Sequence, residues 1–206
     1  MSKRWIAEHK HDYYYKKAKK MDYRCRASFK LIQIDDKFKL LKRNAIVADL
    51  GAAPGGWLQV VKERVGGKGK VVGVDLQEIE PIEGVETIQG DMRKEETVVE
   101  MLEALGGKAD VVLSDMSPKI SGNYSMDHAR SVDLCEHALE FAQKVLKPGG
   151  CLVLKIFEGD MMADVMKLVK ASFKEVKLFG PEASRSSSSE IYIIAKDYIG
   201  ASIRKS

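Results

Sequence analysis

The sequence predicts an α/β fold with a mostly parallel, seven-stranded sheet, helices on both faces and one antiparallel hairpin at the sheet edge. Two observations lead to this prediction. From residue 45 onward, short apolar runs alternate with segments of helical periodicity, which is typical of parallel sheets covered on both faces. The first apolar run ends in a turn of small residues, Gly51–Gly56, where backbone can approach a ligand closely, as in Rossmann-like folds. The 206 residues suffice for one domain.

Each element has a local reason. Leu31, Ile34, Phe38 and Leu41 recur at helical spacing and predict an amphipathic helix over about 24–41. Pro and Gly in Lys147–Gly150 should end a later helix. The last two strands are joined by a short connection without a helix and should form the antiparallel hairpin. We expect the other helices at about 55–65, 95–105, 127–146 and 160–173, and strands at 45–51, 70–76, 85–91, 109–115, 151–157, 175–180 and 190–198.

Apolar spacing also predicts which helix faces turn inward. In the helix expected at 95–105, Val98, Leu102 and Leu105 share one face. In the long helix expected at 127–146, the inward residues should be Val132, Cys135, Leu139, Ala142 and Leu146. Both stripes should pack on the sheet.

Composition excludes several classes of protein. No run approaches the roughly 20 apolar residues of a membrane span, and residues 1–10 lack the apolar core of a secretory signal. We therefore expect a cytoplasmic protein without a membrane partner. Cys25, Cys135 and Cys151 form no CxxC pair, which disfavours disulfides and zinc sites. The four histidines lack metal-ligand spacing, so no metal site is predicted.

Residues 1–30 form a basic, aromatic-rich N-terminal arm that we assign to the same domain. This arm holds ten Lys or Arg against three Asp or Glu, whereas the rest of the chain holds 24 against 27. Basic side chains neutralise phosphates and aromatic rings stack on unpaired bases, which favours nucleic-acid contact over a merely solvated tail. The candidate contacts are Lys3, Arg4, Lys16, Lys17, Lys19, Lys20, Arg24 and Arg26, together with Arg185 in a later serine-rich loop.

Carboxylates at the ends of successive strands indicate the ligand. Asp75 ends the second strand 24 residues after Gly51, an offset that suits ribose hydroxyls, and Asp91 ends the third strand, where it suits an adenine amino group. Either Asp taken alone is more commonly a turn or cap residue. The turn has no Lys and lacks G-x-G-x-x-G, so a nicotinamide dinucleotide is disfavoured. S-adenosylmethionine, which has ribose and adenine but no phosphates, fits this pattern.

The predicted cofactor contacts come from the turn and from the three strand ends. They are Asp49, Gly51, Ala52, Pro54, Gly55, Gly56, Trp57, Asp75, Leu76, Asp91, Met92 and Asp115. Two roles for Trp57 stay open, because its ring suits both packing on the adenine edge and wedging its helix against the sheet.

Four charged residues, one of which is also a predicted cofactor contact, point to catalysis. Asp115 ends the strand at 109–115, and Glu190 begins the last strand. Lys155 lies within the apolar run at 151–157, where a buried Lys needs a partner unless it snorkels at the strand end. Lys30 lies beside the apolar face of the first helix. Each residue is a weak signal alone, but together they would place two lysines and two acids at the reactive end of the ligand.

With these motifs, the chain resembles the FtsJ/RrmJ (RlmE) family of ribosomal-RNA 2′-O-ribose methyltransferases over nearly its whole length. The resemblance implies an S-adenosylmethionine-dependent methyltransferase domain over residues 24–206 and, as substrate, a uridine 2′-OH in large-subunit (23S) rRNA. It also implies a catalytic Lys-Asp-Lys-Glu tetrad at Lys30, Asp115, Lys155 and Glu190. The motifs that carry it are Ala27–Leu31, Asp49–Trp57, Leu113–Pro118, Leu154–Phe157 and Arg185–Tyr192.

Methyl transfer to a ribose needs a proton acceptor for the 2′-OH, and we expect Lys155 to take this role. Burial and the charge of Lys30 favour the neutral amine that a base requires, whereas Asp115 and Glu190 favour the ammonium. A charged Lys155 that orients the 2′ oxygen while the proton leaves later is therefore the open alternative. Asp115 would orient Lys155, and Lys30 and Glu190 would fix the ribose and its phosphate.

Two other functions stay open from the sequence. One is 2′-O-methylation of tRNA or of an mRNA cap, since the tetrad does not discriminate among RNA substrates. The other is a non-catalytic RNA-binding or ribosome-assembly factor, against which the intact tetrad argues. In the leading interpretation the partner is ribosomal RNA, in the large subunit, with no DNA, and the protein is a monomer.

Overall fold

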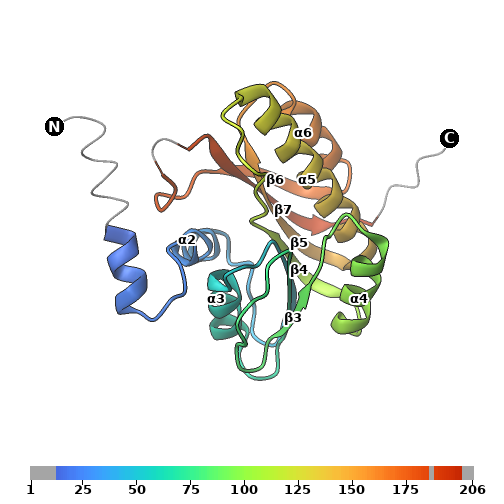
Figure 1. The fold of residues 1–206 in the computed structure, drawn as a ribbon. Helices are drawn as coiled ribbons and strands as arrows, with labels where there is room; N and C mark the ends of the chain where they lie inside the picture. Colours follow the sequence, from blue (N-terminus) through green and yellow to red (C-terminus); the bar gives the residue numbers. More distant parts are fainter. Residues whose placement is uncertain (1–12, 186–187, 201–206) are drawn as a thin grey trace.

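Seven strands form one sheet in the order β3-β2-β1-β4-β5-β7-β6 in the computed structural model, which describes residues 13–185 and 188–200 (Figure 1). The first five strands pair in parallel, and β7 is antiparallel to both of its neighbours, β5 and β6. The predicted mostly parallel sheet with an antiparallel pair at its edge is therefore confirmed. The strands are β1 (Ile46–Leu50), β2 (Lys70–Asp75), β3 (Glu86–Gln89), β4 (Ala109–Ser114), β5 (Leu146–Phe157), β6 (Phe173–Phe179) and β7 (Glu190–Tyr198).

The strand order reverses beside β1. The chain runs outward from β1 through β2 to β3 and then returns to add β4 on the other side of β1. In the register of the sheet, Leu50 lies opposite Val74 of β2 and Ser114 of β4, so all three strands end at the same edge. This edge is the switch point at which open α/β sheets bind ligands.

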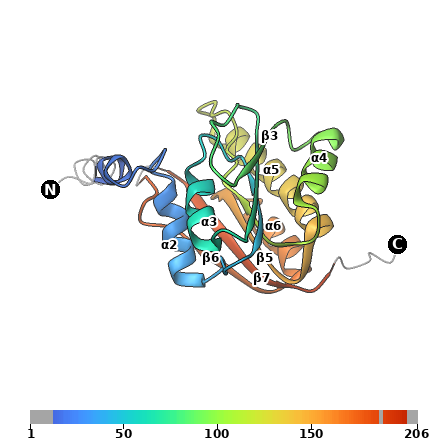
Figure 2. The same ribbon diagram turned by 90° about the horizontal axis from the view of Figure 1, so that it is seen from below.

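Helices cover both faces of the sheet (Figure 2). The residues of α2 and α3 pack on one face, and those of α4, α5 and α6 pack on the other. Within β4, Val111 and Leu113 join the first layer and Val112 the second, which explains why the strand is almost entirely apolar. The helices are α2 (Ser28–Phe38), α3 (Gly56–Val65), α4 (Glu95–Leu105), α5 (Tyr124–Val145) and α6 (Met162–Lys170).

The predicted inward face is confirmed for α5 and only in part for α4, where Leu105 is buried and Val98 packs against the core as expected. All five of the residues expected inward along α5 and at its end are buried. On α4 the buried residues are Thr97, Met101 and Leu105, whereas Leu102 is 36% exposed. Val98, Met101, Leu102 and Leu105 form one broad apolar stripe, and the rotation of the helix against β2 places Met101 rather than Leu102 at its centre.

Two of the boundaries that differ from the pattern have a clear local cause. The helix expected over 24–41 ends at Phe38, because the main-chain N–H groups of Leu40 and Leu41 donate to Asp35 Oδ1 (2.9 and 2.8 Å) instead of continuing the helix. Lys147–Gly150 do follow the end of α5, but they belong to β5 as a bulge. Ala109 of β4 pairs with Leu146 whereas Val111 pairs with Cys151, so the intervening residues leave the ladder.

The described part of the N-terminal arm folds onto the domain. Residues 13–20 are helical, and Ala18 is buried with Phe29 and Ala183. The ring of Phe29 lies 5.5 Å from that of Tyr14 and 5.7 Å from that of Tyr23. Phe29 is buried and the two tyrosines are half-buried, so these three aromatic residues of the arm pack against one another. Tyr13 and Tyr15 are exposed, whereas Trp5 lies outside the described residues.

Across residues 13–185 and 188–200, no helix combines the length and apolarity needed to cross a bilayer.

Candidate active site

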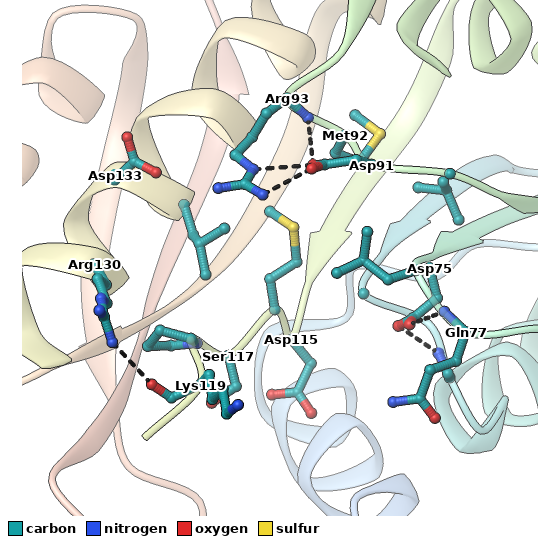
Figure 3. A pocket seen from close by; sticks show the side chains of 18 residues that line it. Asp75, Gln77, Asp91, Met92, Arg93, Asp115, Ser117, Lys119, Arg130 and Asp133 are labelled. Carbon is teal, nitrogen blue, oxygen red and sulfur yellow. Dashed lines mark hydrogen bonds and ion pairs between the residues drawn. The ribbon is translucent and has the colours of Figure 1, made fainter. Parts of the chain in front are cut away.

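A cavity of about 580 Å³ opens at the carboxyl ends of β1, β2, β3 and β4 (Figure 3). Of the predicted cofactor contacts, Gly51, Asp75, Leu76, Asp91, Met92 and Asp115 line it. Several other residues that were not predicted as cofactor contacts also line the cavity, and most of them come from loops or from α5 rather than from strand ends. Among these are Ala53, Gln77, Arg93, Met116, Lys119 and Arg130.

Asp75 is held between the turn after β1 and the loop after β2. Its Oδ2 accepts a hydrogen bond from the main-chain N–H of Ala53 (3.0 Å), and its Oδ1 accepts one from Gln77 (2.9 Å). Each carboxylate oxygen can accept a further hydrogen bond, so both can still accept one from a hydroxyl group. This geometry suits a pair of ribose hydroxyls.

Asp91 is fixed by Arg93, two residues further along the loop. Oδ1 of Asp91 accepts from the main-chain N and from Nε of Arg93 (both 3.0 Å), and Oδ2 accepts from Nη2 (2.7 Å). This bidentate pair lowers the pKa of Asp91 to about 2, mainly through the side-chain hydrogen bond. Asp91 is therefore an ionised acceptor at the cavity wall, held in one orientation.

The small-residue turn serves two sides of the molecule. At Gly51, φ is 75°, and an added Cβ would lie 2.7 Å from Met116 Cγ and 2.9 Å from Met116 Cα, so the close approach to the cavity wall requires glycine. At Gly56, an added Cβ would lie 2.4 Å from Cys25 Sγ. The later glycines thus make room for the segment before α2. Ala52, Pro54, Gly55, Gly56 and Trp57 are absent from the cavity lining.

Trp57 is buried between α2 and the sheet. Its Nε1 donates to the main-chain oxygen of Ala27 (2.8 Å), and its ring lies 5.9 Å from that of Tyr192. These contacts correspond to the wedging role left open from the sequence.

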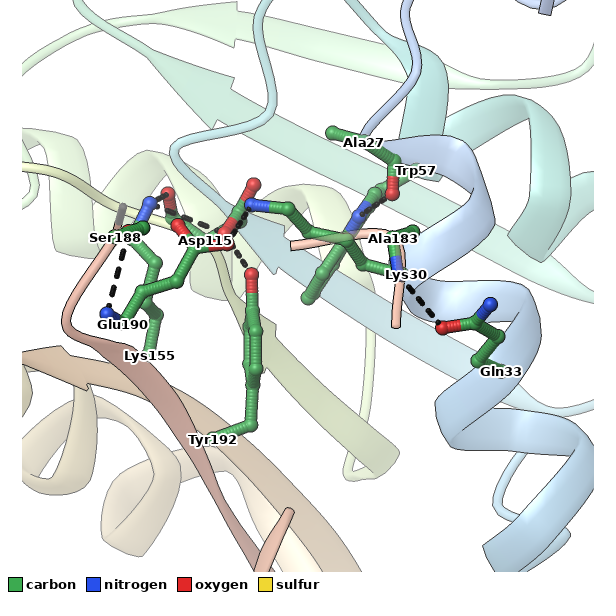
Figure 4. A network of polar contacts seen from close by, with 10 residues as sticks. All are labelled: Ala27, Lys30, Gln33, Trp57, Asp115, Lys155, Ala183, Ser188, Glu190 and Tyr192. Atoms are coloured by element: carbon green, nitrogen blue, oxygen red, sulfur yellow. Dashed lines mark hydrogen bonds and ion pairs between the residues drawn. The ribbon is translucent and has the colours of Figure 1, made fainter. Parts of the chain in front are cut away.

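Two buried lysine–carboxylate pairs lie beside the cavity (Figure 4). Lys155 Nζ is 3.1 Å from Asp115 Oδ1 and donates to the main-chain oxygen of Asp115 (2.6 Å). Lys30 Nζ is 2.5 Å from Glu190 Oε1. The four residues of the predicted tetrad, distant along the chain, are thus brought together as two ion pairs.

The sheet register explains this convergence. Tyr192 of β7 lies directly opposite Lys155 of β5, and Glu190 lies opposite Phe157. Side chains two residues apart on a strand lie on the same face of the sheet. Lys155 and Glu190 therefore lie on the same face as Tyr192, whose buried ring packs toward α2. Lys30 reaches them from the first turn of α2.

Tyr192 links the two pairs. Its hydroxyl donates to Asp115 Oδ1 (2.7 Å), and Lys30 Nζ lies 5.8 Å from the centre of its ring. Burial raises the pKa of Asp115, but the charges of Lys155 and Lys30 and the bond from Tyr192 outweigh it and hold that pKa below the ordinary value. Burial and the nearby carboxylates raise the pKa of Tyr192 well above its usual range, so its phenol keeps the proton. Asp115 is therefore ionised.

Asp49 adds a third carboxyl group beneath the cavity. It is fully buried, and within the described residues neither carboxyl oxygen has a hydrogen-bond partner. Burial, followed by the charges of Asp115 and Asp75, raises the pKa of Asp49 well above its ordinary value. Asp49 therefore keeps its proton, and a cationic ligand would offset the charges of Asp115 and Asp75 that hold it there.

The predicted RNA contacts fall into three groups. Lys3 and Arg4 lie outside the described residues. Arg24 is a structural clamp, since its guanidinium donates to the main-chain oxygens of Pro54, Glu80 and Pro81. Among the others, Lys16, Lys19, Lys20 and Arg185 are exposed, and Lys17 and Arg26 are half-buried.

Arg26 and Arg185 are electrostatic neighbours. Burial and the like charge of Arg185 lower the pKa of Arg26, and the charge of Glu190 opposes them. Two arginines that repel each other beside the tetrad would be stabilised by an anion such as a phosphate.

The fold and the cavity place the chain among the Rossmann-like methyltransferases. Residues 23–198 match the family described as FtsJ-like methyltransferase, and the chain belongs to that family. The ribosomal RNA large subunit methyltransferase E of Methanosarcina mazei is 55% identical over 201 residues, which are 97% of this chain and 74% of that protein. The protein of the same name from Methanocaldococcus jannaschii is 50% identical over 203 residues, covering 96% of this chain and 83% of that one.

A solved structure agrees with this assignment. The crystal structure described as a ribosomal RNA methyltransferase from Plasmodium falciparum matches with a TM-score of 0.79 and 32% sequence identity. The match covers 86% of this chain and 100% of that chain. The resemblance noted from the sequence motifs is therefore confirmed at the level of the family and of the fold.

Proposed function

We propose that this methyltransferase transfers the methyl group of S-adenosylmethionine to the 2′-OH of a uridine in 23S rRNA of the large ribosomal subunit. The observation that carries the proposal is the convergence of Lys155–Asp115 and Lys30–Glu190 beside the cavity at the carboxyl ends of the strands. The names of the relatives support the substrate class. The proposed setting is the cytoplasm, with the protein acting as a monomer and with neither DNA nor a membrane as partner.

The residues around the cavity fit S-adenosylmethionine. Asp75 would hold the ribose hydroxyls, Asp91 the adenine amino group, and Leu76 and Met92 the adenine faces. The partnerless carboxyl group of Asp49 and its neighbours Asp75 and Asp115 favour a ligand that carries positive charge. When bound, the cofactor supplies a methyl group activated by a sulfonium. Of the predicted contacts in the turn, only Gly51 lines the cavity, so the proposal rests less on Ala52, Pro54, Gly55, Gly56 and Trp57.

Lys155 is the proposed proton acceptor. Asp115 fixes Nζ through its carboxylate and its main-chain oxygen, which leaves one direction on that nitrogen for the ribose 2′ oxygen. Such positioning of reactants can contribute about 7–11 kcal/mol to lowering the barrier. A neutral Nζ would take the proton directly, and a charged Nζ would orient the 2′ oxygen until the proton leaves.

Lys30 and Glu190 would hold the acceptor ribose and its phosphate. The pair suits this role because it joins α2 to the first residue of β7, at the end of the connection that carries Arg185. Arg26 and Arg185 would contact the RNA backbone, together with Lys16, Lys17, Lys19 and Lys20 of the N-terminal helix.

The test compares three acceptors. The purified protein is incubated with radiolabelled S-adenosylmethionine and with naked 23S rRNA, isolated large subunits or total tRNA, and 2′-O-methylated positions are mapped. Methylation of a uridine in 23S rRNA is expected. Transfer to tRNA alone, or binding of RNA without binding of S-adenosylmethionine in calorimetry, would overturn the proposal and favour one of the two alternatives.

A further inference from the structure

Gln33 holds together two segments that carry basic residues. Its Oε1 accepts a hydrogen bond from the main-chain N–H of Ala183 (3.1 Å), in the β6–β7 connection (Figure 4). Its Nε2 donates to the hydroxyl of Tyr14 (2.9 Å), in the helix over residues 13–20. A single amide group of α2 therefore contacts both segments.

The position of Gln33 on α2 relates these contacts to the catalytic site. Gln33 lies three residues after Lys30, so the two side chains are neighbours on one side of the helix. Lys30 pairs with Glu190 at the end of the β6–β7 connection, and Gln33 holds Ala183 near its beginning. One side of α2 thus fixes this connection at two points, and the exposed Arg185 lies between them.

We propose that Gln33 is a positioning residue for RNA binding, which sets the location of Arg185 and of the 13–20 helix relative to the tetrad. This inference rests on the proposed RNA substrate. The side chain at position 33 must accept a hydrogen bond from the main-chain N–H of Ala183 and must also form a hydrogen bond with the hydroxyl of Tyr14. Glu meets both requirements, because its second oxygen can accept the Tyr14 hydroxyl proton, whereas Leu meets neither.

Gln59 offers a matched control within the same protein. Its Oε1 accepts from the main-chain N–H of Arg24 (2.8 Å), and its Nε2 donates to the main-chain oxygen of Asp22 (2.9 Å). Gln59 therefore also holds main-chain groups through both ends of its amide, but both contacts are with the segment that follows the 13–20 helix and neither is with the β6–β7 connection. Gln59→Leu should lower the melting temperature by an amount similar to Gln33→Leu.

The experiment measures the Kd of the full chain for transcribed 23S rRNA, the Kd for S-adenosylmethionine, and the KM and kcat of methyl transfer. Gln33→Leu is expected to raise the RNA Kd and KM about tenfold, the loss of roughly one charge-assisted phosphate contact, with kcat and the cofactor Kd unchanged. Gln33→Glu should restore wild-type affinity. In Gln33→Leu/Arg185→Ala, the two effects should multiply only in part, because part of the effect of Gln33 passes through the position of Arg185.

Equal RNA affinity in Gln33→Leu and Gln59→Leu, or fully multiplicative effects in the double variant, would overturn the role of Gln33. Failure of the wild type to methylate 23S rRNA would instead overturn the proposed function. In that case the ratio of RNA affinities between the two Leu variants still decides the role of Gln33.

Discussion

Substitution of Gly51 by Ala tests whether the turn after β1 needs glycine for close approach or only for its backbone conformation. Gly51 has φ of 75°, and a Cβ added there would lie 2.7, 2.9 and 3.0 Å from Met116 Cγ, Cα and N. Gly149, in the bulge of β5, has φ of 81°, and a Cβ added there would have nothing within 4 Å among the described residues. Gly149→Ala therefore carries the conformational penalty alone.

The magnitudes follow from these two environments. A left-handed conformation costs a non-glycine residue roughly 1–2 kcal/mol, which is the whole effect expected for Gly149→Ala. In Gly51→Ala, displacement of Met116 adds about 1–3 kcal/mol, typical of overpacking. In a domain of this size, each kcal/mol lowers Tm by about 2–4 °C, so we expect losses of about 5 °C for Gly149→Ala and about 12 °C for Gly51→Ala.

Thermal denaturation of both variants, with calorimetric titration of S-adenosylmethionine, provides the assay. Gly51→Ala should also weaken cofactor binding, since Met116 lines the cavity, whereas Gly149→Ala should bind normally. Met116→Ala in the Gly51→Ala background should restore only part of the stability, because two of the three close atoms belong to the backbone. If the two glycine variants are equally stable and bind equally well, close approach at Gly51 is not what the turn requires.

Three further changes test the electrostatics of the site. Lys155→Ala should slow methyl transfer to 23S rRNA by at least about 10²-fold, while the calorimetric Kd for S-adenosylmethionine stays near that of the wild type. Transfer at the wild-type rate would exclude Lys155 as proton acceptor. Because the folded-state pKa of Asp49 is raised, its contribution to stability is present below its unfolded pKa and is lost as pH rises. The Tm of Asp49→Asn should therefore rise relative to that of the wild type between pH 5 and pH 8. A Tm difference that does not depend on pH would contradict a neutral buried Asp49. Arg93→Ala should raise the pKa of Asp91 from about 2 toward 3.8. Cofactor binding, measured by titration at each pH, should therefore weaken between about pH 5 and pH 3 more in the variant than in the wild type.

The order of elements could be predicted because it depends on local patterns. Apolar runs located β1 and β2 to within one residue at each end, and the small-residue turn located the edge at which the cavity opens. Contacts set by tertiary packing could not be found in this way. Nothing in the local sequence distinguishes Met101 from Leu102 as the centre of α4, or Gln33 from any other polar residue of an amphipathic helix.

The distribution of charge around the tetrad follows from which partner each lysine meets. Lys155 contacts Asp115, whose carboxylate also receives the Tyr192 hydroxyl, so this acid is held ionised from two sides. Lys30 contacts Glu190, so this pair joins α2 to the start of β7. The segments that carry Arg26 and Arg185 lie directly before these two elements in the chain. In the proposed mechanism this division separates two tasks. The first pair, which includes Asp115 of the cavity lining, would orient the 2′ oxygen, whereas the second would connect that chemistry to the segments proposed to hold RNA. Changes at Gln33 should therefore affect RNA affinity, and changes at Lys155 the chemical step.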